Sequence, residues 1–327
     1  MTEIILVFRK PYSDAFSIEY LFNTLYSEIN NKSDVRKFEL PTATSGITSL
    51  FSNIFALTKF RKNIIHITGD TYYSILGAVF CKRIITFHDF SFLDRTNGLK
   101  RKILKLFWVT LPARFAHKIT VVSQATKEAL LKEEKIDPSK IHVIYNFIDP
   151  AFQPVKRNFN EHHPRILQIG TNFNKNINNL AKALKGITCT LVIIGPLSAL
   201  QKETLSFSGI DYINRFSLSI SELYEEYAKA DLLTFVSTIE GFGLPVLEAQ
   251  ATGLPVVTSN CSSMPEVAGE GALLVDPFDH YSIQKGILEI VKNKNKRAGL
   301  VEKGFINVKR FSKEKIASDY LKLYETL

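Results

Sequence analysis

The sequence lacks the short motifs that mark several large enzyme classes. It contains no Asp-x-Asp, no His-Glu-x-x-His, no Gly-Lys-Ser or Gly-Lys-Thr, and no Gly-x-Ser-x-Gly. The usual signatures of metal-dependent sugar transfer, zinc hydrolysis, Walker-type phosphate binding and esterase chemistry are therefore missing. We expect no metal and no other cofactor, so any phosphate group must be bound by the protein's own cations and backbone amides.

Cysteine and long apolar runs are also scarce. The three cysteines, Cys81, Cys189 and Cys261, are scattered, and their spacing predicts neither a metal site nor a disulfide framework. This usage is typical of a reducing compartment, so we expect a cytoplasmic protein. No stretch reaches the roughly 18–20 apolar residues of a spanning helix. The first residues read as a strand rather than a signal peptide, because no basic start precedes a long apolar run.

Acidic residues are outnumbered in the first half of the chain. The net charge is +9, and residues 1–150 hold 21 Lys and Arg against 14 Asp and Glu, whereas residues 151–327 hold 20 against 18. Residues 59–118 alone hold 12 basic and 3 acidic residues. A basic face implies an anionic partner: a membrane, a nucleic acid or a phosphorylated substrate. The lack of aromatic-plus-basic RNA motifs argues against nucleic acid.

The length of 327 residues and the 45% hydrophobic content predict a globular protein of two domains. Both halves repeat a rhythm of short apolar strands and helices, and the proline-containing residues 147–164 are the natural linker. Strands are expected at residues 4–8, 37–40, 63–68, 83–87, 118–122 and 141–145, then at 165–169, 190–194, 212–213, 231–236 and 255–259.

The most informative stretch is residues 238–259, which reads as loop, helix and strand. Its loop contains Gly241 and Gly243, which let a ligand approach the backbone closely. The helix starts near Leu244, and its N-terminal amides attract a phosphate. A Gly-x-Gly alone favours an ordinary turn between strand and helix, and Val246 stands where a dinucleotide fingerprint has its third glycine.

Two carboxylates frame this loop. Glu240 precedes the glycines and Glu248 lies eight positions later, inside the helix. A carboxylate repels a phosphate, so we expect both to accept hydrogen bonds from sugar hydroxyls. A nucleotide-sugar, which has hydroxyls on both sides of its diphosphate, fits two separated carboxylates. The alternative is a pair of ordinary surface glutamates.

Two further residues follow predicted strands. His88 lies at the carboxyl end of the strand expected at 83–87, the edge where open α/β sheets bind ligands. Lys175 follows Gly170 in a strand–loop–helix segment that offers a second phosphate site. The alternatives are a histidine that satisfies local backbone and a solvated lysine.

Residues 97–117 combine basic side chains with an apolar stripe. A basic amphipathic helix with an aromatic residue can lie in a membrane interface, but the same pattern fits a surface helix whose stripe packs in the core. The residues predicted for the acceptor or membrane side are Arg9, Lys10, Lys100, Arg101, Lys102 and Trp108.

Taken together, Glu240-Gly-Phe-Gly-Leu-Pro, Glu248-Ala and Gly253-x-Pro-Val-Val resemble the Glu-x7-Glu signature of the family 4 glycosyltransferases. The match continues through Ser262-Ser263-x-Pro265-Glu266 and Gly271-Ala-Leu-Leu-Val-Asp276-Pro277. The resemblance implies an α/β protein of the GT-B fold, with two Rossmann-like doubly wound domains facing across a cleft. We expect an acceptor-side domain over residues 1–150, a nucleotide-sugar-binding domain over 151–311, and a final helix over 312–327 that crosses back to the first domain.

The resemblance also implies roles for single residues. Glu248 would bind the ribose diol, Glu240 the donor sugar and its surroundings, and His88 the sugar from the first domain. Lys175 and the backbone amides of the loop would stabilise charge growing on the phosphate. The predicted catalytic residues are Glu240, His88 and Lys175, and the predicted donor-binding residues are Gly170, Gly241, Phe242, Gly243, Leu244 and Glu248.

Four segments depart from the family pattern. Ala15-Phe16-Ser17-Ile18-Glu19 stands where the family's first loop has glycines, and Phe147 replaces the glycine of an Asn-Gly-Val-Asp segment. Thr171 stands near the usual arginine of the diphosphate site, and Arg215-Phe216-Ser217 replaces a glycine after a short strand. The roles of the first loop and of the base-binding wall therefore stay open.

The sequence as a whole predicts a retaining glycosyltransferase that moves a hexose-type sugar from a nucleotide-sugar donor, a UDP- or GDP-sugar, to a glycan or lipid-linked acceptor. We expect it in surface polysaccharide or glycolipid assembly, peripheral on the inner face of the plasma membrane, with the anionic membrane surface as a partner. The alternatives are a nucleotide-sugar epimerase or a phosphorylase of related fold, and a non-catalytic basic binding module.

Overall fold

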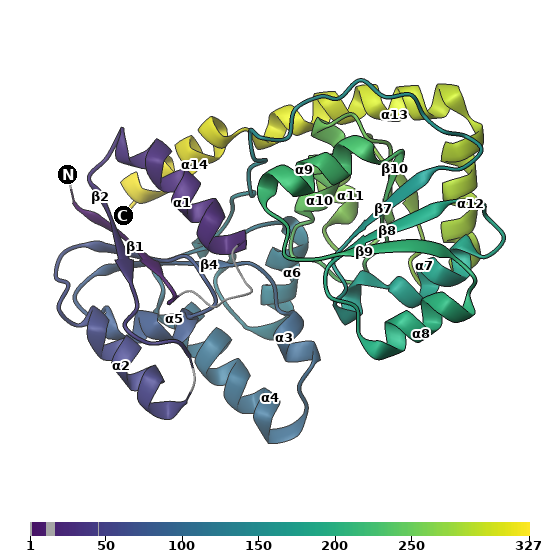
Figure 1. Cartoon of the computed structure of the whole chain (residues 1–327). Coiled ribbons are helices and arrows are strands. Elements are labelled where there is room, and N and C mark those ends of the chain that lie inside the picture. The colour runs from purple at the N-terminus through teal and green to yellow at the C-terminus, as the bar shows by residue number, and fades with distance from the viewer. Residues whose placement is uncertain (1, 11–16, 45) are drawn as a thin grey trace. The chain divides into compact units, whose positions relative to one another are not determined.

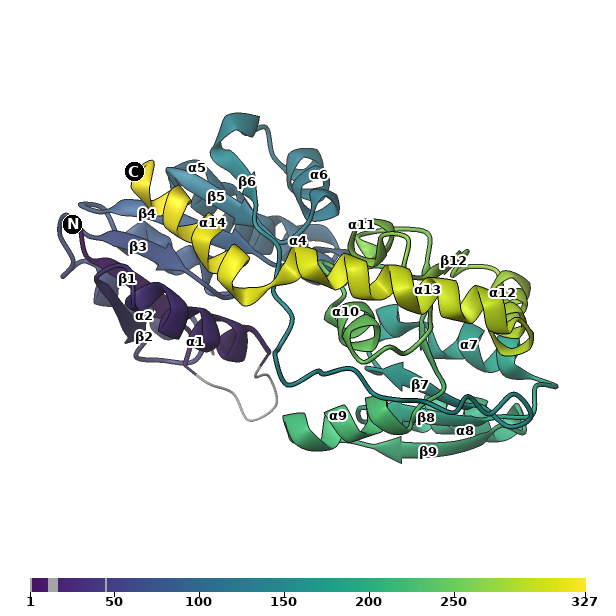
Figure 2. The same ribbon diagram turned by 90° about the horizontal axis from the view of Figure 1, so that it is seen from above.

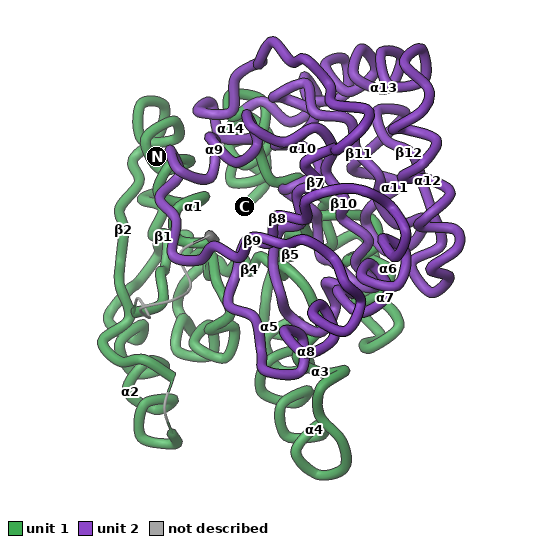
Figure 3. Tube along the Cα trace, turned by 45° about the vertical axis from the view of Figure 1, so that its right-hand side comes forward, with its two compact units in different colours: residues 1–147, 313–327 green, residues 148–312 purple. Residues whose placement is uncertain are grey.

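The computed structural model describes the whole chain except residues 1, 11–16 and 45 (Figure 1). It divides into two compact units (Figure 3). Unit 1 comprises Met1–Phe147 and Lys313–Leu327, and unit 2 comprises Ile148–Ser312. Each unit contains a six-stranded parallel sheet with helices on both faces, which confirms the predicted α/β class with two Rossmann-like parts.

The sheet of unit 1 has the strand order β2-β1-β3-β4-β5-β6, with every neighbouring pair parallel. The chain leaves β1 to one side for β2 and returns on the other side for β3, so the topological switch point lies between β1 and β3. The strands are β1 (Ile4–Phe8), β2 (Val35–Glu39), β3 (Ile64–Ile67), β4 (Lys82–Phe87), β5 (Lys118–Val121) and β6 (Ile141–Val143).

Helices cover both faces of this sheet. The longer ones are α1 (Ser17–Asn30), α2 (Ile47–Leu57), α4 (Gly98–Lys105), α6 (Gln124–Glu133) and α14 (Lys313–Glu325), and the shorter ones are η1 (Tyr72–Gly77), α3 (Ser91–Asp94), η2 (Leu106–Thr110), α5 (Leu111–Phe115) and η3 (Pro138–Lys140). The stretch expected as one helix over residues 97–117 is therefore α4, a short π-helical segment and α5. The sequence analysis did not predict α2.

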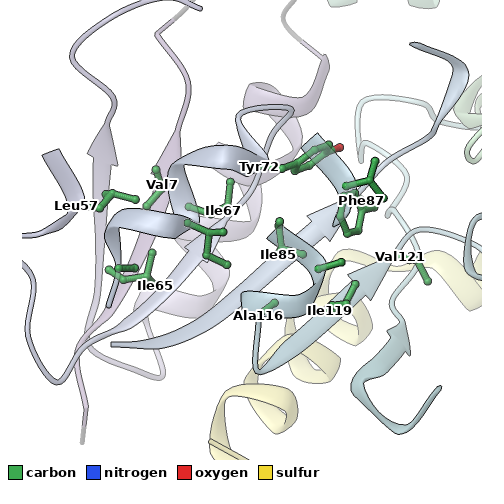
Figure 4. Close-up of a cluster of buried hydrophobic side chains, with 14 of the residues drawn as sticks. Val7, Leu57, Ile65, Ile67, Tyr72, Ile85, Phe87, Ala116, Ile119 and Val121 are labelled. Atoms are coloured by element: carbon green, nitrogen blue, oxygen red, sulfur yellow. The ribbon is translucent and has the colours of Figure 1, made fainter. Parts of the chain in front are cut away.

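A separate core lies on each face of the sheet. On one face, strand residues such as Ile65 and Phe87 pack against Leu57 of α2 and Ala116 (Figure 4). On the other, α1 and α14 lie side by side, as both Figures 1 and 2 show, and close over the remaining strand side chains. The central strands β1, β3, β4 and β5 are largely buried on both faces, and this explains why they read as mainly apolar runs.

The α14 side of the sheet contains a buried histidine. His66 of β3 shares one hydrogen bond with the hydroxyl of Tyr324, 2.8 Å from Nδ1, and another with Thr86 Oγ1, 2.7 Å from Nε2. Burial lowers the pKa of His66 to about 3, so the ring is neutral at neutral pH. The hydrogen bond with Tyr324 joins the last helix, α14, to the middle of the sheet, and the one with Thr86 joins β3 to β4.

The sheet of unit 2 has the order β12-β11-β10-β7-β8-β9, again with parallel neighbours. Its switch point lies between β7 and β10. The strands are β7 (Arg165–Ile169), β8 (Thr190–Ile194), β9 (Asp211–Arg215), β10 (Leu232–Phe235), β11 (Val256–Ser259) and β12 (Leu273–Val275).

The helices of unit 2 again cover two faces, over two clusters of buried side chains. They are η4 (Phe173–Lys175), α7 (Ile177–Leu184), α8 (Ala199–Phe207), α9 (Ile220–Lys229), α10 (Leu244–Ala251), α11 (Met264–Ala268), α12 (His280–Lys292), α13 (Lys294–Asn307) and η5 (Val308–Phe311). The strand expected at 212–213 is longer than predicted, and β12 and α13 were not predicted.

We expect Tyr324→Phe to lower the free energy of unfolding by about 1–3 kcal/mol, because it leaves one nitrogen of the buried His66 without its partner. Urea unfolding followed by circular dichroism measures the change. Tyr281→Phe, at an exposed tyrosine of α12, is the matched control and should change stability little. Equal stability of the two variants would contradict a structural role for this hydrogen bond.

Candidate active site

An ion pair joins two loops at the switch point of unit 2. Lys175 ends η4, in the loop after β7, and its Nζ lies 2.5 Å from Oε1 of Glu240, in the loop after β10. Asn174 Nδ2 donates to the same carboxylate oxygen over 3.1 Å, and the ammonium lies 4.4 Å from the centre of the Phe235 ring. Both charged side chains are largely buried, so the pair is held in one arrangement.

Gly170 makes room for this pair. Its φ is +85°, in the region that favours glycine, and an added Cβ would lie 2.8 Å from Cε of Lys175. The glycine that directly follows β7 therefore lets the lysine chain lie along the end of the strand. The structure thus brings together three residues that the sequence predicted for this site, Gly170, Lys175 and Glu240.

Two serines hold the glycine loop. The Glu240 N–H donates to Ser262 Oγ over 3.0 Å, and Ser262 Oγ donates back to the Glu240 carbonyl over 2.7 Å. Ser263 Oγ donates to the Phe242 carbonyl over 2.7 Å. The sequence analysis noted both serines as part of the motif but gave them no role, and their role is to fix the loop that carries Glu240.

The helix α10 starts directly after this loop. Its N-cap, Gly243, has φ +114°, and an added Cβ would lie 2.4 Å from Cε of Met264. Leu244 begins the helix, and its amide and that of Gly243 lie at the N-terminal end, where the helix dipole favours an anion. Phe242 is buried and packs against Phe311, so its side chain is part of the core beneath the loop.

Glu248 lies one turn further along α10 and is partly buried. Its Oε2 accepts a hydrogen bond from the hydroxyl of Tyr227 in α9, over 2.6 Å. Burial raises the pKa of Glu248 to about 7, and the nearby charge of Asp149 adds to the rise. The charge of Lys175 lowers the pKa of Glu248, so the predicted catalytic lysine and the predicted donor-binding glutamate influence one another electrostatically. The sequence analysis missed Tyr227, because no local pattern links it to Glu248.

A second charged cluster lies at the switch point of unit 1. Arg9 follows β1 and is buried, where its guanidinium pairs with Glu19 of α1 and with Asp70, whose Oδ2 lies 2.8 Å away. The sequence analysis treated Arg9 as a surface charge, and the structure corrects this view. Lys10 is exposed. Residues 11–16, which include Ala15 and Phe16 of the departure from the family's glycine-rich loop, lie outside the described residues.

His88 stands at the carboxyl end of β4, as predicted. Its Nε2 donates to the Thr68 carbonyl over 2.8 Å, and burial lowers the pKa of the ring. The neutral ring then carries its lone pair on Nδ1, which can accept a hydrogen bond but cannot donate one. The Thr68 carbonyl therefore fixes the tautomer of His88. The sequence predicted that His88 lies at the carboxyl edge of the sheet, but it could not predict the tautomer.

The basic side chains of residues 97–117 are of two kinds, exposed ones and ones paired with acidic residues. In α4, Lys100 and Lys102 are exposed, whereas Arg101 Nη2 lies 2.6 Å from Glu133 of α6. Trp108 is half-buried, with its ring centre 4.9 Å from that of Tyr73. The structure therefore does not place the six residues predicted for an acceptor or membrane side on one surface.

Among the residues that the structure describes, no group of three or more histidine, cysteine, aspartate or glutamate side chains is placed to hold a metal ion. None of the described helices is long and apolar enough to cross a bilayer.

Two family models match this chain. One, described as "Glycosyl transferases group 1", matches residues 150–307, and the other, described as "Glycosyltransferase Family 4", matches residues 24–152. This chain belongs to the family 4, group 1 glycosyltransferases. The resemblance inferred from the Glu240–Glu248 motif is therefore confirmed.

This chain is similar to two curated O-antigen enzymes. It is 28% identical over 214 residues to O-antigen chain mannosyltransferase RfbU of Salmonella typhimurium, covering 63% of this chain and 60% of that protein. It is 39% identical over 101 residues to O-antigen chain mannosyltransferase B of Escherichia coli, covering 31% of this chain and 26% of that protein. The chain thus spans less than two thirds of the length of either relative.

Solved structures share the fold. Sucrose-phosphate synthase from Thermosynechococcus elongatus superposes with a TM-score of 0.81 at 17% identity, over 100% of this chain and 99% of that one. HepE from Anabaena, solved with UDP and glucose, gives a TM-score of 0.78 at 14% identity over 100% of both chains. The predicted GT-B fold class of the glycosyltransferase is confirmed.

The raised pKa of Glu248 makes stability depend on pH. Its ordinary pKa is 4.5 and its folded value is about 7, so between these limits the folded state binds more protons than the unfolded state. Stability contributed by the neutral carboxyl is therefore lost as pH rises through this window. We expect Glu248→Gln to abolish this loss, so the difference in Tm between variant and wild type should become more positive as pH rises.

Differential scanning calorimetry from about pH 5 to about pH 8 measures this difference, across the upper part of the window in which the linkage acts. Glu225→Gln, at an exposed carboxylate of α9, is the control and should give a difference that does not change with pH. A pH-independent difference for Glu248→Gln would mean that the folded carboxyl ionises normally.

Proposed function

We propose that this glycosyltransferase moves a hexose-type sugar from a nucleoside-diphosphate sugar to a glycan or lipid-linked acceptor, with retention of anomeric configuration and without a metal ion. The observation that carries the proposal is the Lys175–Glu240 pair beside the N-terminus of α10, with Glu248 one turn further on. This arrangement supports the proposal, because one cation and the amides of a helix N-terminus can bind a diphosphate, and two carboxylates can accept hydrogen bonds from sugar and ribose hydroxyls.

The names of the relatives support the biological setting. Two of them are O-antigen chain mannosyltransferases, and structural neighbours were solved with UDP and with UDP-glucose. We therefore propose assembly of a surface polysaccharide or glycolipid, in the cytoplasm, with a UDP- or GDP-sugar as donor.

The proposed reaction exchanges one bond at the anomeric carbon. The bond from C1 to the phosphate oxygen breaks, the acceptor hydroxyl oxygen bonds to C1 on the same face, and the departing phosphate takes the hydroxyl proton. Lys175 and the amides at the start of α10 stabilise the negative charge that grows on the leaving phosphate, so no separate base is required. Glu248, in its ionised form, accepts from the ribose diol, and His88 Nδ1 accepts from a sugar hydroxyl.

The pairing of Lys175 with Glu240 gives the two residues opposite effects on nucleotide binding. Lys175→Gln removes the cation, and we expect it to lower kcat by about 10²–10³-fold and to weaken binding of the nucleoside diphosphate. Glu240→Gln frees the ammonium and removes a negative charge near the phosphates. It should therefore bind the nucleoside diphosphate at least as tightly as the wild type while losing transferase activity.

Isothermal titration with nucleoside diphosphates in EDTA, and a coupled release assay for turnover, measure these effects. Lys182→Gln, at an exposed lysine of α7, is the matched control and should leave both unchanged. Weaker nucleotide binding by Glu240→Gln would show that the carboxylate does not compete with the phosphates for Lys175.

A thermal shift with UDP, GDP, ADP, dTDP and CMP in EDTA identifies the donor class. A nucleotide at ~100 times its dissociation constant adds about 2.7 kcal/mol of stability. Transfer is then tested with the corresponding sugars, and NMR of the product gives the anomeric configuration. Donor turnover without acceptor would instead indicate an epimerase, and no shift with any nucleotide would contradict the proposed donor site.

A further inference from the structure

The helix α2 presents its apolar residues to the outside of unit 1. Ile47, Phe51 and Phe55 follow one another at four-residue spacing and form one stripe, with 70%, 66% and 77% of their surfaces exposed. The helix contains no charged residue, and the residues of α2 that are buried are Ser49, Asn53 and Leu57. An amphipathic helix on a soluble core normally has the opposite orientation.

Polar anchors fix this orientation. Asn53 is fully buried, and its amide donates to the Thr42 carbonyl over 2.9 Å and to the Tyr73 hydroxyl over 2.8 Å. Its Oδ1 accepts from the Thr42 backbone N–H over 3.1 Å. Leu57 enters the core shown in Figure 4. A Cβ at Gly77 would lie 1.8 Å from the Ile54 carbonyl oxygen, so the α2 backbone packs directly on η1. These contacts fix α2 in the orientation that exposes its apolar stripe.

Basic and apolar side chains lie next to the stripe. Phe80, in the turn before β4, is exposed, and the Arg61 guanidinium lies 4.5 Å from the centre of its ring. The Lys62 N–H donates to the Phe80 carbonyl over 3.0 Å, which joins the turn after α2 to the turn before β4. Lys59, Arg61 and Lys62 are all exposed.

The helix α4 adds a second element of the same kind. Leu99 and Ile103 are exposed beside the exposed Lys100 and Lys102. Figures 1 and 3 place α2 and α4 along the same, lower side of unit 1. We call the α2 stripe, Phe80, the exposed basic residues 59–62 and the outer side of α4 the basic-apolar face.

Acidic residues are scarce in the segment that contains α2 and the turns around it. Between residues 41 and 88 the sequence has five basic residues, Lys59, Arg61, Lys62, Lys82 and Arg83, and a single acidic one, Asp70. Asp70 follows β3, at the opposite end of that strand from Arg61 and Lys62, and pairs with the buried Arg9. The charged residues in the turn after α2 and at the start of β4 are therefore all basic.

We propose that the basic-apolar face docks on an anionic lipid bilayer, with the α2 stripe among the acyl chains and the lysines and arginines at the headgroups. A large apolar stripe rimmed by cations is the pattern of an interfacial helix. A two-fold dimer through the same surface would bring like positive charges together, which favours the bilayer over a second copy of this chain. This docking does not depend on the proposed sugar chemistry.

Vesicle flotation of the full chain, without donor or acceptor, tests the proposal. The wild type should float with vesicles of phosphatidylcholine and phosphatidylglycerol and bind far less to phosphatidylcholine alone. The double variant Phe51→Ser, Phe55→Ser should lose at least about tenfold in partitioning, because two exposed rings no longer enter the membrane. Lys100→Gln with Lys102→Gln should lose about fivefold per charge on the anionic vesicles only.

Phe207→Ser, at a phenylalanine of α8 that is 93% exposed, is the matched control and should float like the wild type. Circular dichroism and Tm check that each variant folds, which is expected because the substituted side chains lie outside the core. A wild type that does not float, or a Phe51→Ser, Phe55→Ser variant that floats normally, overturns the proposal. So does a dimer in sedimentation that this variant dissociates while vesicles stay unbound, because the face would then be an interface between copies.

Discussion

The Lys175–Glu240 ion pair is the interaction on which the site of unit 2 depends. In a parallel sheet the loops at the carboxyl ends of neighbouring strands meet at one edge, and the switch point between β7 and β10 leaves a gap between the loops that follow them. The ion pair spans that gap. Gly170, which has no Cβ, leaves room for the Lys175 side chain, and Ser262 and Ser263 hold the loop that carries Glu240. The carboxylate that fixes the position of Lys175 also balances its charge. Under the proposed function, a diphosphate would therefore compete with Glu240 for the ammonium.

In unit 1 an ion pair also joins the loops on the two sides of the switch point. Its switch point lies between β1 and β3, and Arg9, after β1, reaches Asp70, after β3. Here the cation has two carboxylate partners and is more deeply buried, which makes it a fixed part of the scaffold. The nearby His88 is neutral and keeps one acceptor nitrogen. In both sheets a cation after one strand of the switch point thus pairs with a carboxylate after the other, with one carboxylate partner in unit 2 and two in unit 1.

The sequence predicted the sheets well because both faces of each central strand are covered, so β1, β3, β7 and β10 consist mostly of apolar residues. It failed where burial is decided by partners distant in the chain. Nothing local shows that Asn53 anchors α2 with its apolar side outward, or that Tyr227 lies on Glu248. Arg9 reads as a loop charge until Asp70, 61 residues later, is placed beside it. The glycine loop and its two glutamates were recognisable because their spacing is local.

The position of α14 has a consequence for how the protein is made. Unit 1 starts at the first residue but needs the last helix of the chain, because Tyr320 and Tyr324 cover His66 and one face of the sheet. Unit 2 is encoded without interruption between these two parts. On the ribosome, unit 2 is complete before the segment that finishes unit 1 has been synthesised. Until then α1 alone covers this face of the first sheet, and the part that α14 covers stays exposed. Loss of α14 would therefore damage the unit whose synthesis begins first.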